Sequence, residues 1–301
     1  MFKKKYLPFV LILSGVFLIG VSLVLGYKLR DLHSSISSQR IKNGLTPADI
    51  AKNAHPAPTA LPTPSPSPRP LTFEELNAMY GPCLHLPVLF YHHIQNMDVA
   101  RAAGQQNLTV ATDIFIKQMQ YLKDKGYIPQ GTNAVSDFFD KGIVPPARSL
   151  LLTFDDGYED FYVNVVPILQ QMGFKGILAL PTGLVGNPGY LTWDEISQAA
   201  GAGIEIINHT WSHANLATSN TGLIQREIST ANDQLTSRGY NQNKAFVYPY
   251  GTSNAYDVTY LQSKGYTMAF TTVPGSTLCK KQRFTLPRIR IGNASLSAYG
   301  F

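Results

Sequence analysis

The sequence predicts an α/β fold, a distorted (β/α) barrel of seven to eight mainly parallel strands that follows one transmembrane helix and a proline-rich linker. Over residues 71–301, short apolar runs alternate with amphipathic segments, which is typical of a parallel sheet covered by helices. Most amphipathic segments end at a glycine just before the next apolar run. An open doubly wound sheet is the alternative, but no G-x-G-x-x-G motif follows a predicted strand.

The positive charge of the chain is concentrated in its N-terminal part. The 301 residues carry 25 Lys and Arg against 19 Asp and Glu, a net charge of +6. Nine of the basic residues but only two of the acidic ones lie in residues 1–70, which leaves 16 basic against 17 acidic groups in residues 71–301. A nearly neutral domain lacks the basic face that binds nucleic acid, so we expect no nucleic-acid partner.

The N-terminus predicts a membrane anchor. Residues 1–5 are short and basic, and residues 6–27 contain no charged side chain. A helix of that length spans about 33 Å, enough for a hydrocarbon core of about 30 Å. The run is longer than that of a cleaved signal peptide and lacks a clear cleavage site, so we favour an uncleaved signal anchor. The preceding lysines favour a single-pass protein of the cell membrane with its domain outside the cytoplasm.

Residues 28–70 are predicted to form a Ser/Pro-rich linker between the anchor and the domain. Seven of the fifteen residues from 56 to 70 are proline, a composition that favours extended polyproline II structure. At about 3.1 Å per residue, this stretch reaches roughly 45 Å. A ligand for a proline-binding partner is the alternative, but beside a membrane helix we favour a spacer.

The remaining residues, 71–301, contain the predicted strands and helices of the barrel. The apolar runs predict strands at Leu86–Tyr91, Tyr127–Pro129, Ser149–Phe154, Gly176–Leu180, Ile204–Asn208, Ala245–Tyr248, Thr267–Thr271 and Leu286–Ile291. The segments between them predict helices at Thr112–Lys125, Glu159–Met172, Thr192–Ala200, Gly222–Arg238 and Ala255–Lys264. Two cysteines, Cys83 and Cys279, flank the domain and could form a disulfide outside the cell, but sequence alone leaves their pairing open.

Polar clusters follow four of the predicted strands, and two arginines lie on the last one. The clusters are Tyr91–His93, Thr153–Gly157, Asn208–His213 and Tyr248–Gly251, and the arginines are Arg288 and Arg290. In a parallel barrel the loops after the strands meet at one end, where catalytic residues lie. The sequence therefore predicts a functional site that combines these clusters.

Two carboxylates and two histidines in these clusters suggest a metal site. Asp155 and Asp156 end a buried strand, where one could bind a metal while the other faces water, although Asp-Asp-Gly is also good turn chemistry. His209 and His213 are four residues apart, so a helical turn would place both imidazoles on one face. Two histidines and one aspartate leave open coordination positions, as a catalytic metal requires. These ligand types admit zinc, cobalt, nickel or iron.

The motifs TFDDG at residues 153–157 and HTWSH at 209–213 together resemble the polysaccharide deacetylase family, which is carbohydrate esterase family 4 with the NodB-homology domain. Residues 248–251 resemble the third motif of that family and residues 191–194 its tryptophan motif, so the resemblance covers most of residues 86–291. The resemblance implies a metal-dependent hydrolase that binds one divalent metal, zinc first, through Asp156, His209 and His213. It further implies Asp155 as the catalytic base, the Tyr250 N–H in the oxyanion hole, and Trp193, His93 and Pro249 along the substrate groove.

The sequence departs from the family pattern at two places. Val247 occupies the position where the third motif usually begins with an arginine that holds the base, and Arg288 or Arg290 could supply that charge instead. The usual C-terminal Leu-x-His motif of the general acid is also missing. A segment of the form P-V-L-x-Y-H opens the domain, as in the poly-β-1,6-N-acetylglucosamine deacetylases of biofilm systems. That resemblance implies His92 as the acid, with His93 as the second choice.

The resemblance implies an enzyme that removes acetyl groups from N-acetylglucosamine residues of an extracellular polysaccharide, most directly poly-β-1,6-N-acetylglucosamine. Deacetylases of chitin-like glycans, peptidoglycan or acetylated xylan remain alternatives, because loops set substrate choice on a shared scaffold. A tethered, inactive glycan-binding module is a further alternative, although binding alone would not need Asp155 as a base. Phosphoryl chemistry at Asp155 is disfavoured because the expected Asp-x-Asp-x-Thr arrangement is missing.

Overall fold

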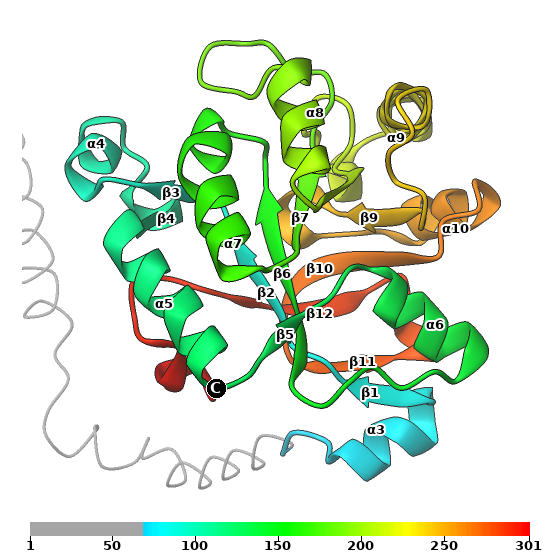
Figure 1. Cartoon of the computed structure of the whole chain (residues 1–301). Coiled ribbons are helices and arrows are strands. Elements are labelled where there is room, and N and C mark those ends of the chain that lie inside the picture. The colour runs from blue at the N-terminus through cyan, green and yellow to red at the C-terminus, as the bar shows by residue number, and fades with distance from the viewer. Residues whose placement is uncertain (1–68) are drawn as a thin grey trace, which may run out of the picture. The chain divides into compact units, whose positions relative to one another are not determined.

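Seven parallel strands close into a barrel in the computed structural model, which describes residues 69–301 (Figure 1). The strands around the barrel are β2 (Val88–Tyr91), β12 (Leu286–Arg290), β10 (Met268–Pro274), β9 (Ala245–Val247), β8 (Ile204–Asn208), β7 (Gly176–Leu180) and β6 (Ser149–Asp155). Pairing of β6 with β2 closes the ring, and the short β5 (Ile128–Pro129) pairs with the first two residues of β6. The prediction of a closed parallel barrel is confirmed.

The predicted N-terminal anchor, residues 6–27, and nearly all of the predicted linker, residues 28–70, lie outside the described residues. Within residues 69–301, no helix combines the length and the apolar character needed to cross a bilayer.

The observed strands follow the apolar runs closely. Strands β7 and β8 have the predicted bounds, and β6 continues one residue further to Asp155. Four shorter strands were not predicted, because three residues are too few to show a pattern: β1 (Cys83–His85), β3 (His93–Gln95), β4 (Thr109–Ala111) and β11 (Thr277–Cys279).

Helices surround the barrel and connect successive strands (Figure 1). Their bounds are α3 (Phe73–Tyr80), α4 (Met97–Ala102), α5 (Thr112–Asp124), α6 (Asn133–Lys141), α7 (Val166–Met172), α8 (Trp193–Gly201), α9 (Thr221–Thr236) and α10 (Ala255–Ser263). The predicted helix at Glu159–Met172 instead begins with a π-helical turn, Phe161–Val165, before α7. The regular hydrogen-bond pattern cannot run through this junction because Pro167 has no N–H to donate.

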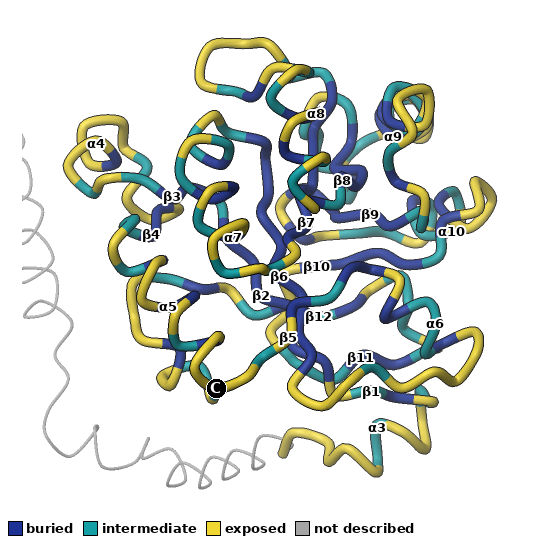
Figure 2. The backbone as a smooth tube through the Cα atoms, viewed as in Figure 1, coloured by how far each residue is buried: buried dark blue, intermediate teal, exposed yellow. Residues whose placement is uncertain are grey.

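The core lies on both sides of the barrel wall. Alternate side chains of the strands, such as Leu151, Ile177 and Phe270, face the same side of the wall and form one cluster. Their neighbours along the chain, such as Leu150 and Leu178, pack in a second cluster with residues of the surrounding helices. Figure 2 shows the strands as buried, with the exposed residues on the outer turns of the helices. Because both faces are buried, the strands are continuous apolar runs, and polar chemistry is confined to their ends.

A disulfide joins the first and last parts of the domain. Strands β1 and β11 pair antiparallel, and Cys83 lies opposite Cys279 with the two Cα atoms 4.1 Å apart. The pairing that the sequence left open is therefore present, and it links residues separated by 196 positions.

We predict that replacing both cysteines by serine lowers the free energy of unfolding by about 2–5 kcal/mol, because the cross-link restricts a very long loop in the unfolded chain. Urea unfolding of the Cys83→Ser/Cys279→Ser protein measures the change. The wild-type protein under reducing conditions is the control and should match the double variant. Equal unfolding midpoints for the oxidised wild type and the variant would contradict the prediction.

Candidate metal centre and active site

The carboxyl ends of the barrel strands surround a cavity of about 630 Å³, which we call the main cavity. It is lined by Phe90, His92, Leu108, Asp155, Asp156, Tyr158, His209, His213, Tyr248, Tyr250, Gly251, Thr272, Pro274, Arg288 and Arg290. All four predicted polar clusters contribute to it, as does the last strand. The topology therefore brings together residues that are up to 200 positions apart, counted from Phe90 to Arg290.

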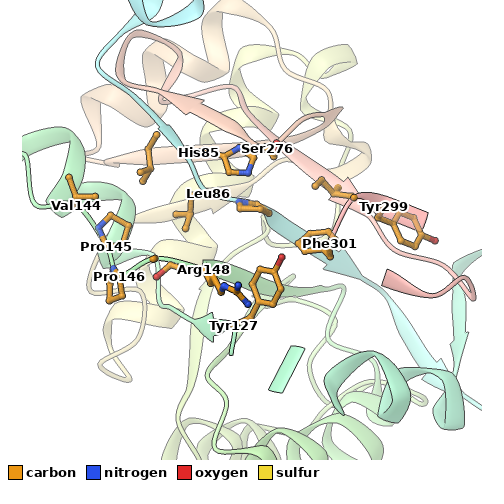
Figure 3. Close-up of a pocket in the computed structure, with 16 residues that line it drawn as sticks. His85, Leu86, Tyr127, Val144, Pro145, Pro146, Arg148, Ser276, Tyr299 and Phe301 are labelled. Carbon is orange, nitrogen blue, oxygen red and sulfur yellow. Dashed lines mark hydrogen bonds between the residues drawn. The ribbon is translucent and has the colours of Figure 1, made fainter. Parts of the chain in front are cut away.

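A second hollow, of about 380 Å³, opens at the opposite end of the barrel, where β2 and β6 begin (Figure 3). Its wall includes Tyr127, Pro145, Arg148 and Phe301. Among the described residues that line it there is no Asp or Glu side chain, and the single histidine is His85. Hydrolytic chemistry of the predicted kind therefore belongs to the main cavity.

Three side chains in the main cavity converge as metal ligands would. The Asp156 Oδ1 atom lies 3.3 Å from His209 Nε2 and 3.0 Å from His213 Nε2, and the ligand atoms of all three residues lie within 4.8 Å of one another. Asp156 Oδ1 is buried without a hydrogen-bond partner. His209 Nδ1 lies 2.7 Å from the carbonyl oxygen of Val247. That carbonyl can only accept, so Nδ1 carries the proton and Nε2 presents its lone pair to the other two ligands. This set of donors fits a divalent transition metal.

The two histidines do not lie on a helical turn, so the prediction of helical spacing is wrong. Residues 209–213 form an irregular loop in which Thr210 and His213 adopt left-handed conformations, with φ of 70° and 62°. The carboxylate of Glu227, on α9, accepts hydrogen bonds from the N–H groups of Trp211 and Ser212 at 3.1 and 2.7 Å. It also accepts one from the Ser212 hydroxyl at 2.7 Å. These bonds hold the loop so that both imidazoles face Asp156.

Glu227 is a functional residue that the sequence reasoning missed. It is fully buried, on the same face of α9 as Ile224, Ile228 and Ala231. An acidic side chain on the apolar face of an amphipathic helix was the available signal, because burial of a carboxylate requires several hydrogen-bond donors. The donors lie in the loop that carries the metal ligands.

Of the two arginines on the last strand, Arg288 reaches Asp155. Its Nη1 and Nη2 atoms donate to Asp155 Oδ1 and Oδ2 at 2.8 and 2.7 Å, and its Nε donates to the carbonyl oxygen of Thr271 at 2.9 Å. The guanidinium is fully buried over the ring of Phe90. Burial alone would raise the pKa of Asp155, but the charge and hydrogen bonds of Arg288 outweigh burial and leave that pKa below its usual value. Asp155 is therefore ionised and fixed in orientation.

Arg290 does not reach Asp155. Its Nη2 atom donates to the carbonyl oxygen of Asn107 at 2.7 Å, and its side chain lies at the edge of the main cavity. Of the two arginines that the sequence left open, the structure places Arg288 beside Asp155.

His92 and His93 lie on opposite sides of the chain after β2. His92 lines the main cavity, where burial lowers its pKa and the charges of Asp155 and Asp156 only partly oppose that effect. His93 instead lines a neighbouring hollow of about 500 Å³. Its Nδ1 atom lies 2.6 Å from Asp160 Oδ2, and its ring stacks on Tyr158 with the centroids 3.7 Å apart. Of these two histidines, His92 is the one placed to exchange a proton in the main cavity.

The cluster Tyr248–Gly251 forms another part of the wall of the main cavity. Tyr250 adopts a left-handed conformation with φ of 61°, and its ring lies 4.9 Å from that of His213. The next residue, Gly251, has no room for a side chain, because a Cβ atom there would lie 2.0 Å from Thr272 Oγ1. Pro249 is buried behind this turn and does not line the main cavity. The turn exposes the Tyr250 ring at the rim, with 61% of the residue accessible.

Trp193 is not brought into the main cavity. It is the first residue of α8 and packs against the core. The guanidinium of Arg238 lies 3.9 Å from the centroid of its ring. Tyr158 and Leu108, which the sequence reasoning did not select, line the main cavity instead. Leu108 gave no signal, whereas Tyr158 directly follows the Asp-Asp-Gly turn.

Residues 142–269 match the family model described as polysaccharide deacetylase. The matched segment contains the three metal-ligand candidates, Asp155 and Tyr250. His92, which directly follows β2, and Arg288, which lies on β12, are outside the matched residues.

Several named proteins are similar to this chain. YxkH of Bacillus subtilis, itself a candidate polysaccharide deacetylase, is 28% identical over 216 residues, which cover 71% of this chain and 75% of that protein. The poly-β-1,6-N-acetyl-D-glucosamine N-deacetylase of Escherichia coli K12 is 27% identical over 247 residues. That match covers 67% of this chain but only 36% of the E. coli protein, so this chain corresponds to about a third of that relative.

Solved structures show the same fold. The Streptococcus pyogenes deacetylase PplD, solved in complex with acetate, superposes with a TM-score of 0.67 at 28% identity, covering 72% of this chain and 96% of PplD. IcaB from Ammonifex degensii superposes with a TM-score of 0.61 at 20% identity, covering 69% and 91%. Together with the geometry of the main cavity, these similarities show that the chain contains a polysaccharide deacetylase domain of the NodB-homology family, carbohydrate esterase family 4, whose members are hydrolases.

Proposed function

We propose that this protein removes acetyl groups from N-acetylglucosamine residues of an extracellular polysaccharide, with poly-β-1,6-N-acetylglucosamine as the substrate. The observation that carries the proposal is the buried, ionised Asp155 beside a cluster of three metal ligands in one open cavity. The E. coli relative, which is named for this substrate, supports the choice of polymer. The segment of the form P-V-L-x-Y-H at residues 87–92, which opens the domain, supports this choice as well.

The reaction breaks the amide C–N bond and forms a C–O bond from water. A divalent cation held by Asp156, His209 and His213 would supply a Lewis acid that acidifies water and polarises the acetyl carbonyl. Asp155 accepts the proton of the attacking water, because Arg288 keeps its carboxylate ionised and oriented. The backbone N–H of Tyr250 hydrogen-bonds the oxygen on which negative charge develops. His92 delivers a proton to the departing nitrogen, so the products are acetate and a glucosamine unit with a protonated amine.

We further propose that zinc is the metal in use, with cobalt, nickel or iron as alternatives, because one carboxylate and two imidazoles suit all four ions. The predicted anchor and linker would hold the domain outside the cell membrane, close to its polymer. Each deacetylation creates a cationic amine, so the enzyme would change the charge of that polymer.

The substrate proposal is tested by acetate release from matched β-1,6- and β-1,4-linked N-acetylglucosamine oligomers, with divalent metal added. We expect release mainly from the β-1,6 oligomers. Release mainly from the β-1,4 oligomers would support the same reaction but indicate chitin-like or wall glycans as the substrate. A metal-loaded protein that releases acetate from neither would favour the glycan-binding alternative.

We predict that Asp156→Ala, His209→Ala and His213→Ala each abolish stoichiometric metal binding, because each removes one of three converging ligands. Metal content per chain after dialysis, measured by mass spectrometry, gives the result. His85→Ala, which removes an exposed histidine at the other end of the barrel, is the matched control and should retain the metal. A ligand variant that binds metal as tightly as the wild type would exclude that residue.

We predict that Asp155→Asn retains the metal but lowers turnover at least about 100-fold, because the amide cannot accept the proton of water. Steady-state acetate release and metal content on the same sample separate the two effects. Unchanged turnover would remove Asp155 from the role of base.

We predict that His92→Ala lowers turnover about 100-fold, whereas His93→Ala lowers it less than tenfold, because only His92 lines the main cavity. The ratio of kcat values on one substrate measures the difference. A larger loss for His93→Ala would reverse the two assignments.

A further inference from the structure

Arg290 is a cation at the active site that the proposed chemistry does not use. It ends β12 opposite Phe90 of β2, two residues before His92, so the two side chains leave neighbouring strand ends. Within residues 69–301, no carboxylate lies within ion-pair distance of it, and its hydrogen bond to Asn107 engages only Nη2. Most of its N–H groups are therefore available to another acceptor.

A smaller cavity of about 230 Å³ lies beside the main cavity, and we call it the side chamber. His92, Leu108 and Arg290 line both cavities, so they form the boundary between them. The rest of the side chamber is lined by Asn107, Thr109, Ile291, Gly292 and Tyr299. None of these residues is acidic, whereas Asp155 and Asp156 both line the main cavity. Among the described residues that line the side chamber, Arg290 is the one permanently charged side chain.

The polar groups of the side chamber are donors with spare capacity. The Tyr299 hydroxyl accepts a hydrogen bond from the Gly292 N–H at 2.8 Å, which leaves its own proton free to donate. Arg290 offers charge-assisted donors, which bind carboxylates more strongly than neutral donors do. Leu108 and Ile291 supply apolar surface of the kind that a methyl group contacts. A chamber of this size has room for a small organic acid.

We propose that the side chamber is an exit site for the acetate anion, with Arg290 as the residue that binds its carboxylate. The inference rests on the proposed function, in which acetate forms between Asp155 and His92. The polymer fills the open mouth of the main cavity during turnover, so acetate needs another way out. Arg290, the one permanently charged side chain among the described residues of the side chamber, attracts the newly formed carboxylate past His92.

Binding of acetate to the full chain tests the proposal directly. We would measure the relaxation of ¹³C-labelled acetate by NMR with the metal removed, so that acetate bound to a metal does not contribute. Acetamide, a neutral molecule of similar shape, is the matched probe. We expect Arg290-dependent binding of acetate and about tenfold weaker binding of acetamide. Equal binding of the two probes would overturn the proposal.

Variants locate the site. Arg290→Gln should weaken acetate binding about tenfold, and Arg290→Lys should restore most of it because it retains the charge. Lys175→Gln is the control, since it removes one exposed positive charge just before β7, at the opposite end of the barrel. Wild-type affinity in Arg290→Gln, or an equal loss in Lys175→Gln, would overturn the proposal.

Product inhibition of the metal-loaded full chain separates this proposal from the proposed function. The inhibition constant of added acetate should rise about tenfold in Arg290→Gln and stay unchanged in Lys175→Gln. If all three proteins release acetate and added acetate inhibits them with the same constant, the exit site is excluded. The proposed deacetylase function is then still supported. Arg290-dependent binding in a protein that releases no acetate from any polymer would instead remove the proposed function.

Discussion

The buried ion pair between Arg288 and Asp155 is the interaction on which the active site depends. A carboxylate at the end of an apolar strand is costly unless a cation meets it with good geometry, and Arg288 does so through two parallel hydrogen bonds. The same guanidinium is held by the Thr271 carbonyl and lies over Phe90, so its position is set by the barrel wall. The pair keeps Asp155 charged and immobile beside the metal ligands, which is what a base requires.

The barrel supplies the second constraint, because it gathers short polar segments at one end. Strands β2, β6, β8, β9 and β12 each end at the main cavity, so no loop has to reach far. Where a loop must adopt a strained shape, a buried group holds it. Glu227 fixes the loop between His209 and His213, and the Val247 carbonyl sets the tautomer of His209. Ligand geometry is therefore determined by α9 and β9 as much as by the motif itself.

Much of the fold could be predicted because the barrel strands are buried on both faces and appear as continuous apolar runs ended by turn residues. Asp155, Asp156 and the two histidines could be identified because they follow such runs. The shape of the loop at 209–213 could not be predicted, because it depends on Glu227, which is 14 residues beyond His213. The choice between Arg288 and Arg290 depended on strand register, which no local pattern reveals. Trp193 matched a motif, yet packing against Arg238 keeps it outside the main cavity.

The most direct test of this account is the turnover of Arg288→Met with metal content measured on the same sample. The methionine removes the charge and both hydrogen bonds to Asp155 but none of the metal ligands. We expect a folded protein with about one metal per chain and acetate release at least about 100-fold slower than that of the wild type. Arg288→Lys, which retains a charge, should recover part of the loss. Wild-type turnover in Arg288→Met would contradict the account, because Asp155 would then act without the partner that the fold provides.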